Sequence, residues 1–169
     1  MQNLDRLINV YEFALNQEYT GKAFFETALS RLSVGAAVDA FKKLIQEEEK
    51  HIRFISSILE RLREGKELRV EELREVVGEV PNYFVDRATK ERLDSTVLDS
   101  MIPDVTVFNT AWLIEKDLSD FYRRMAERSD GEVRGAFRLL SEWEKVHEEF
   151  FREYRDRLQK MYEGLPWGG

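Results

Sequence analysis

The chain contains two histidines, and each follows a glutamate by three positions: Glu48 precedes His51, and Glu144 precedes His147. Residues three apart on a helix lie on the same side of it, so each pair presents a carboxylate and an imidazole in one direction. This combination favours iron or manganese, because calcium and magnesium sites rarely use histidine and zinc seldom needs so many oxygen ligands. The spacing therefore predicts two metal-binding pairs.

The segments around these pairs repeat each other, which brings two more glutamates into the pattern. The first half of the chain aligns with the second when the register slips by one residue at the loop. The aligned residues are Glu18 with Glu115, Phe25 with Tyr122, Phe41 with Phe137, Glu48 with Glu144, and His51 with His147. The pattern indicates a duplicated helical hairpin, with one glutamate on its first helix and Glu-x-x-His on its second.

All six of these side chains fall on the apolar stripes of the helices expected around them. Burying an isolated carboxylate costs on the order of several kcal/mol unless it is paired or bound to a cation. No lysine or arginine on the same stripes is clearly placed to neutralise the four carboxylates. Two metal ions would do so, each holding one histidine and one terminal carboxylate while the remaining two carboxylates bridge the ions.

Four long helices must position these side chains, and the apolar period predicts them. Their expected ranges are about 4–32, 35–62, 105–127, and from the Ser-Asp-Gly segment at 129–131 to 162. Short loops join the first helix to the second and the third to the fourth, so each pair should form an antiparallel hairpin. Ser129 and Glu132 have capping-box spacing at the start of the fourth helix.

Residues 63–104 connect the two hairpins and are too many for a turn, so they should form a crossover along the bundle. Within it, "RVEELREVVGEV" predicts a short helix that covers the bundle, with membrane contact as the less favoured alternative. The prediction is an all-α four-helix bundle forming one domain over 1–162. A tail over 163–169 follows, and we expect its Trp167 to pack onto the bundle rather than to serve as a docking peptide.

Composition limits the possible functions of the chain. A net charge of −7 argues against nucleic-acid binding, which needs a concentrated basic face. No apolar run approaches the ~20 residues that span a membrane, and "MQNLDRLINVYEF" at the N-terminus has no signal-peptide pattern, so we expect a soluble, cytoplasmic protein. The absence of cysteine excludes disulfides, thiolate catalysis and cysteine-ligated zinc or iron–sulfur clusters within this chain.

Four segments carry a resemblance to a known family: "QEYTGKAFF" at 17–25, "EEEKH" at 47–51, "IEKDLSDFY" at 114–122 and "EWEKVH" at 142–147. They resemble the di-iron domain of rubrerythrins, in the ferritin-like superfamily. The resemblance implies a ferritin-like four-helix bundle that holds two iron ions, with manganese as the other possibility. The ligands that it implies are Glu18, Glu48, His51, Glu115, Glu144 and His147.

The resemblance also implies an oxidoreductase that reduces peroxide or dioxygen in oxidative-stress defence. The chain departs from typical rubrerythrins at two places. It lacks their rubredoxin-like four-cysteine iron site, so electrons would have to come from an external donor protein. Leu118 stands where rubrerythrins usually place a second glutamate, three residues after the ligand on the third helix, which weakens the peroxidase assignment. We also expect a homodimer.

Three other functions stay open at this point. A di-iron monooxygenase of the ubiquinone-precursor hydroxylase type has the same doubled ligand pattern, but it would need an apolar substrate channel and a membrane-facing surface. An iron-binding or storage protein would need a shell-forming oligomer. A bundle with an empty site would act through a partner, and stoichiometric metal analysis would identify it.

Other residues close to the predicted ligands have simpler interpretations. Aromatic side chains near them are expected to be core more often than tuners of the site, and they are Tyr11, Tyr19, Tyr122 and Trp143. Further glutamates near them fall off the apolar stripes and are expected to be solvated, and they are Glu47, Glu49, Glu142, Glu148 and Glu149.

Overall fold

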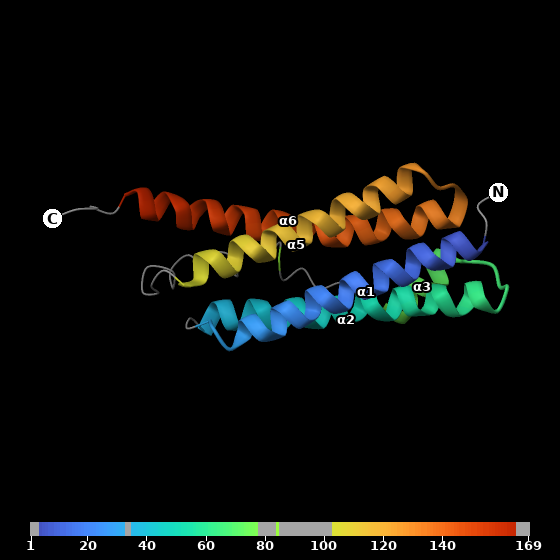
Figure 1. Ribbon diagram of the computed structural model, residues 1–169, viewed down its shortest axis with the longest axis horizontal. Helices are drawn as coiled ribbons and strands as arrows, with labels where there is room; N and C mark the ends of the chain where they lie inside the picture. The colour runs from blue at the N-terminus through green and yellow to red at the C-terminus, as the bar shows by residue number, and fades with distance from the viewer. Residues whose placement is uncertain (1–3, 33–34, 78–83, 85–102, 165–169) are drawn as a thin grey trace.

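The computed structural model describes residues 4–32, 35–77, 84 and 103–164, and every regular element in these ranges is a helix (Figure 1). The helices are α1 (Leu4–Leu29), α2 (Gly35–Arg63), α3 (Val70–Val77), α5 (Pro103–Glu127) and α6 (Gly131–Glu163). The four long helices and the short crossover helix were all predicted. The end of the predicted tail, including Trp167, lies outside the described residues.

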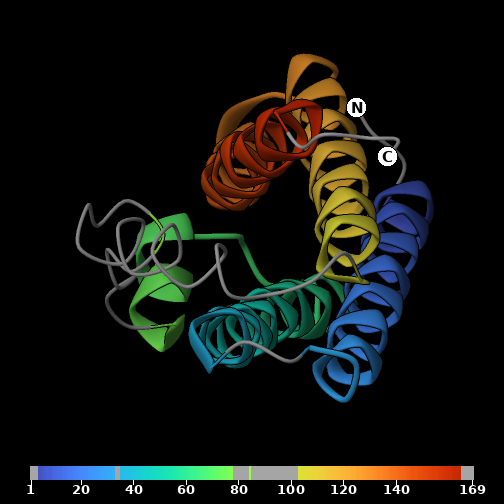
Figure 2. The ribbon, with the colours of Figure 1, turned by 90° about the vertical axis from the view of Figure 1, so that its left-hand side faces the viewer.

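The long helices form two antiparallel hairpins, α1 with α2 and α5 with α6 (Figure 1). Seen from the end of the bundle, α2, α1, α5 and α6 follow one another around its axis, and α3 lies on the side between α2 and α6 (Figure 2). This arrangement confirms the all-α ferritin-like bundle. Two ends differ from the prediction: α1 stops at Leu29, and α5 begins at Pro103, where proline is tolerated because the first helical N–H has no partner.

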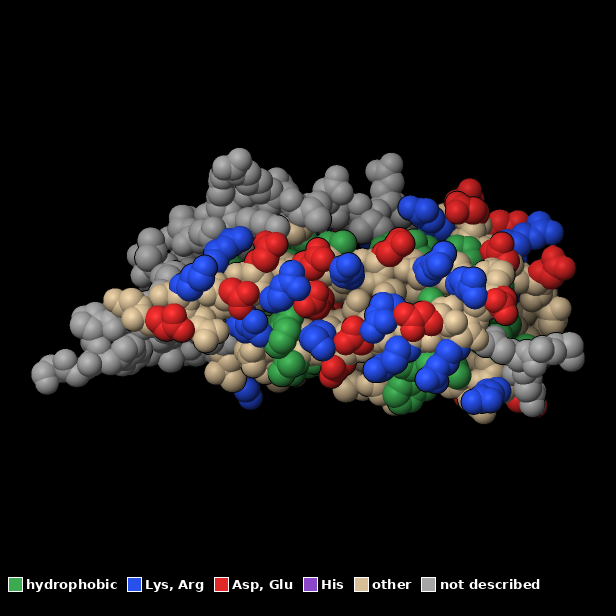
Figure 3. Space-filling view, turned by 90° about the horizontal axis from the view of Figure 1, so that it is seen from above, with side chains coloured by type: hydrophobic (Ala, Val, Ile, Leu, Met, Phe, Trp, Pro, Cys, Tyr) green, Lys and Arg blue, Asp and Glu red, His purple; other side chains and the backbone are tan. Residues whose placement is uncertain are grey.

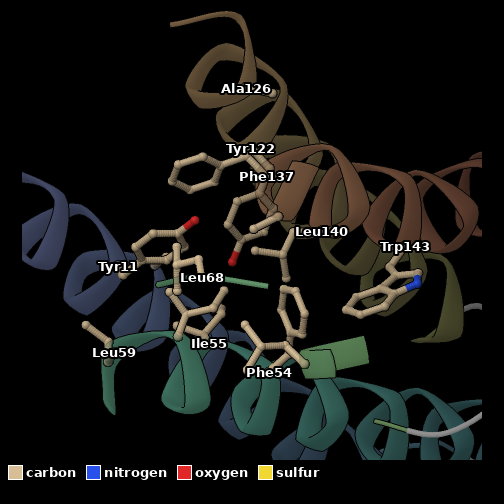
Figure 4. Close-up of a cluster of buried hydrophobic side chains, with 14 of the residues drawn as sticks. Tyr11, Phe54, Ile55, Leu59, Leu68, Tyr122, Ala126, Phe137, Leu140 and Trp143 are labelled. Carbon is tan, nitrogen blue, oxygen red and sulfur yellow. The ribbon is translucent and has the colours of Figure 1, made fainter. Parts of the chain in front are cut away.

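Two apolar clusters fill the bundle, and the six predicted ligands lie between them along all four long helices. One cluster includes Tyr11, Phe54, Phe137 and Leu140 and is drawn in Figure 4. The other is rich in phenylalanine and centres on Phe41, which is fully buried. Each buried aromatic or aliphatic side chain contributes roughly 1.5–3 kcal/mol. Burial of the two apolar clusters therefore stabilises the folded bundle, whereas the polar residues between them do not.

The crossover helix α3 is fastened to both hairpins. Its apolar side chains Leu73 and Val77 are buried, as predicted for a helix that covers the bundle. Glu132 Oε2 on α6 accepts a 2.7 Å hydrogen bond from the Val70 N–H at the first turn of α3. The capping box predicted for Ser129 and Glu132 is therefore wrong. The carboxylate of Glu132 accepts from Val70 rather than from the Ser129 N–H, which donates to the Ala126 carbonyl instead.

The surface of the bundle mixes charges of both signs. Acidic and basic side chains are interspersed over the face seen in Figure 3, with small apolar areas between them. Many form exposed ion pairs one helical turn apart, such as Lys116 with Asp120 and Arg123 with Glu127. None of the described helices combines the length and apolar character needed to cross a membrane.

Candidate metal centre

The six predicted ligands meet inside the bundle at the middle of the four long helices. Glu18 comes from α1, Glu115 from α5, and one Glu-x-x-His pair from each of α2 and α6. All four carboxyl side chains are fully buried, and neither histidine is more than 3% exposed. Positions that repeat at three and four residues along each helix thus bring the six groups together, as the apolar stripes predicted.

The six groups form two overlapping sets, each with ligand atoms within 4.8 Å of one another. One set is Glu18, Glu48, His51 and Glu144, and the other is Glu48, Glu115, Glu144 and His147. Each set contains one histidine and one glutamate of its own, and both sets share Glu48 and Glu144. The sets thus have the composition expected of two metal positions with one histidine each and two carboxylates in common.

In the first set, the Nδ1 atom of His51 faces three carboxylates. It lies 2.6 Å from Glu144 Oε1, 3.6 Å from Glu48 Oε2 and 3.8 Å from Glu18 Oε2. The hydroxyl group of Tyr122 donates a 2.5 Å hydrogen bond to the other oxygen of Glu18. This bond fixes the orientation of the Glu18 carboxyl group and leaves Oε2 directed at the histidine.

In the second set, the Nδ1 atom of His147 has the same kind of surroundings. It lies 3.4 Å from Glu48 Oε1, and 3.7 Å from both Glu115 Oε2 and Glu144 Oε2. Its other ring nitrogen, Nε2, is in short contact with Oε2 of Glu47. A carboxylate on Nε2 fixes the tautomer that leaves Nδ1 free to bind a metal ion.

Glu47 and Glu148 correct the expectation that the neighbouring glutamates are solvated. Glu47 is 4% exposed and contacts His147, while Glu148 is 9% exposed and accepts a 2.8 Å hydrogen bond from the indole N–H of Trp112. The sequence did contain a signal that Glu47 is buried. Phe54 and Ile58 follow it at helical spacing on the same side of α2, and both are buried.

Of the four nearby aromatic residues, two touch the ligands. Tyr122 bonds to Glu18, and the ring of Trp143 stacks on that of His51 with 5.2 Å between centroids and 9° between planes. Tyr11 is core, as expected, because it stacks on Phe137 and burial raises the pKa of its hydroxyl group far above the usual range. Tyr19 is 51% exposed.

The carboxyl groups of Glu18 and Glu115, which each belong to one set only, are held in the neutral form. Burial is the first cause of the raised pKa of Glu18, and the negative charges of Glu144 and Glu48 add to it. The same causes raise the pKa of Glu115 well above its usual range. A neutral carboxyl group costs much less to bury than a carboxylate, so protonation relieves the metal-free cluster.

The two shared carboxylates and the two histidines are held in the charged form. Burial opposes charge on all four, but attraction between opposite charges outweighs it. Glu144 and Glu48 raise the pKa of His51 well above its usual range, and the surrounding carboxylates do the same for His147. The pKa of Glu144 is well below its usual range, and that of Glu48 is about 2. Two imidazolium cations thus balance two carboxylates.

The cluster leaves several buried polar atoms without hydrogen bonds among the described residues. They are both oxygens of Glu48, both oxygens of Glu115, one oxygen each of Glu18 and Glu144, and Nδ1 of His147. A buried polar atom without a partner costs about 1–3 kcal/mol, so a concentration of them in one place calls for an occupant. Hard or borderline cations fit the donor set, because it combines carboxylate oxygens with imidazole nitrogens.

A small cavity of about 30 Å³ adjoins the cluster on the side between α2, α3 and α6. Its lining residues are Glu47, Lys50, His51, Val77, Trp143, Val146 and His147. Because a water molecule needs roughly 10–15 Å³ of such space, the cavity admits one or two small molecules. Leu118, three residues after Glu115, is buried in the apolar cluster of Tyr11 and Phe137.

Comparison with known proteins agrees with this geometry. A family model described as Rubrerythrin matches residues 9–154, a range that contains all six buried ligand candidates. Searches among curated proteins and solved structures return no match to the chain. The four-helix arrangement, the doubled Glu and Glu-x-x-His pattern and the family match agree with one another. The chain therefore belongs to the rubrerythrin family of the ferritin-like superfamily.

Proposed function

We propose that the chain binds two iron ions in the two overlapping sets and acts as an oxidoreductase on peroxide or dioxygen. The observation that carries this proposal is the pair of buried four-ligand sets that share Glu48 and Glu144. Glu18 and His51 would hold one ion, and Glu115 and His147 would hold the other. When bound, two ferrous ions supply the two electrons that, with two protons, convert one hydrogen peroxide into two waters.

The chain's own residues prepare the site for this reaction. The apolar clusters on both sides exclude bulk water, which strengthens every electrostatic interaction between them. Tyr122 orients Glu18, and Glu47 orients His147. The metal-free cluster holds four protons, one each on His51, His147, Glu18 and Glu115, so two divalent ions that replace all four keep the buried charge balanced.

The size of the cavity favours a small substrate over the substrate of a quinone-type hydroxylase. Within the described residues, the cavity that touches both histidines has a volume of about 30 Å³. An aromatic ring needs several times this volume, whereas peroxide and dioxygen fit. Since the chain has no cysteine for an electron-transfer centre of its own, we propose that a separate donor protein re-reduces the ions.

The experiment is anaerobic loading with ferrous iron, followed by addition of hydrogen peroxide or dioxygen to the desalted protein. We expect two ions per chain and consumption of about one peroxide for each reduced pair, with continued turnover when a chemical reductant is supplied. His147→Ala should retain at most one ion per chain and should not consume peroxide in this ratio. Glu49→Gln, which alters a partly exposed ion pair with Lys22, should keep two ions and the peroxide consumption.

Two other outcomes would replace the proposal. Protein that retains two ions but consumes neither oxidant faster than His147→Ala would be an iron-binding protein without turnover. A hydroxylated product from an added aromatic substrate would favour the monooxygenase, and a chain that retains no ions would leave only the interaction function.

A further inference from the structure

The two halves of the duplicated hairpin differ in the residues that contact the histidines. The alignment that places Glu48 on Glu144 also places Glu47 on Trp143, the residue before each shared carboxylate. Both side chains reach across to the histidine of the other hairpin. Glu47 contacts Nε2 of His147, whereas Trp143 stacks on the ring of His51. Both rings have an aromatic neighbour, since the ring of Phe84 meets that of His147 edge-on at 4.8 Å, but only His147 has a carboxylate from outside the six ligand candidates.

This difference affects the binding of a cation at each position. A carboxylate on Nε2 orients the imidazole and makes its Nδ1 atom a stronger donor. The carboxylate also lies close enough to an ion on Nδ1 to attract it electrostatically. The indole ring of Trp143 is neutral and packs in the apolar cluster with Phe54, so it supplies neither effect to His51.

A second difference acts in the opposite direction but is weaker. Tyr122 donates a hydrogen bond to Glu18, whereas the aligned residue is Phe25, and both oxygens of Glu115 lack a partner among the described residues. The hydroxyl group orients Glu18 with Oε2 directed at the cluster. It is a neutral dipole, however, and does not match a full carboxylate charge beside the other histidine.

We propose that the two metal positions are unequal and that Glu47 causes the inequality. The His147 position, made of Glu115, His147 and the shared carboxylates, binds its ion first and more tightly. The His51 position, made of Glu18, His51 and the same shared carboxylates, binds the second ion and exchanges it more readily. Glu47 is a positioning residue that acts through His147. This inference rests on the proposed function, because it assumes that the cluster binds two ions.

Comparison of single histidine variants separates true inequality from repulsion between two bound ions. His51→Ala leaves the His147 position intact, and His147→Ala leaves the His51 position intact. Calorimetric titration of the metal-free proteins with ferrous iron, without oxygen, measures one ion in each. We expect the affinity of His51→Ala to exceed that of His147→Ala by about tenfold or more. Equal affinities, or the reverse order, would overturn the inference.

Glu47→Gln then tests the cause. In the His51→Ala background it should weaken binding by about 10–100-fold, and in the His147→Ala background it should change nothing, because the partner of Glu47 is gone. An equal loss in both backgrounds would mean a merely structural effect and would contradict the assignment. Glu49→Gln, the same substitution two residues away, is the matched control.

The otherwise unchanged chain provides a second measurement if a histidine variant folds poorly. There, Glu47→Gln should weaken the first of two binding steps and leave the second within about twofold. The reverse pattern would overturn the inference. Two ions bound with no preference would contradict the inequality alone, whereas no binding to the unchanged chain would contradict the proposed function as well.

Discussion

The ends and the middle of this bundle follow the same helical period, but apolar side chains occupy the buried positions at the ends and polar side chains occupy them in the middle. At the ends, rings pack against rings: Phe41 meets Phe25, Phe108 and Phe151 at centroid distances of 5.9, 5.5 and 5.6 Å. In the middle, positions on the same stripes carry carboxyl groups and imidazoles. Several of their polar atoms have no hydrogen-bond partner in the described part of the chain.

The difference shows which part of the molecule is explained by folding alone. Removal of apolar surface from water accounts for the ends without any ligand. Burial of the middle is unfavourable in the metal-free protein, because charged groups and polar atoms without partners are buried together. A group of residues that opposes folding yet lies at the centre of the bundle points to a bound species that repays the cost.

The largest expected effect is at the apolar end. Phe41→Ala should lower the free energy of unfolding by about 3–5 kcal/mol, with or without metal, because it opens a cavity among buried rings. Chemical denaturation in the presence and absence of chelator measures this. Phe13→Ala, at a ring that is 52% exposed and meets Phe121 edge-on, should cost less than about 1 kcal/mol. Equal losses would break the comparison.

In the middle, substitution should stabilise the metal-free protein, and more so at higher pH. The raised pKa of Glu115 means that the folded state holds a proton that the unfolded state has lost above about pH 4.5. Stability should therefore fall as the pH rises through this range, by up to about 1.4 kcal/mol per pH unit for this one group. Glu115→Gln should remove that slope.

Denaturation of chelator-treated protein between pH 5 and 8 tests this prediction. The free energy of unfolding of Glu115→Gln should rise relative to that of the unchanged chain as the pH rises. Glu18→Gln should behave in the same way, since the pKa of Glu18 is raised by the same causes. Glu49→Gln, at a partly exposed glutamate, should run parallel to the unchanged chain. Parallel curves for Glu115→Gln would mean that its carboxyl group is not held neutral.

A smaller effect is expected at the hydrogen bond between Tyr122 and Glu18. Tyr122→Phe should cost about 1 kcal/mol in the metal-free protein, where Glu18 is neutral. It should also lower the affinity for the second ion several-fold, because a hydrogen bond to an ionised carboxylate is stronger than one to a neutral carboxyl group. Tyr19→Phe makes the same change at an exposed ring and should do neither. Stronger binding of the second ion by Tyr122→Phe would contradict this reading.

The fold and the six buried groups could be predicted because each depends on one helix at a time. The spacing of Glu48 and His51 fixes their common direction, and the apolar stripe fixes that direction inward. Glu47 could not be placed in this way. It is buried because α6 and α3 cover a second side of α2, and that depends on packing between helices. Glu132 was assigned to the wrong helix start for the same reason.

The central claim is that six groups buried between two apolar clusters form a site for two metal ions. The most direct test is elemental analysis of the desalted chain after anaerobic loading with ferrous iron, alongside the doubly substituted His51→Ala, His147→Ala chain. We expect two ions per unchanged chain and almost none in the double variant. No retained iron in the unchanged chain, or two ions in both proteins, would contradict the claim.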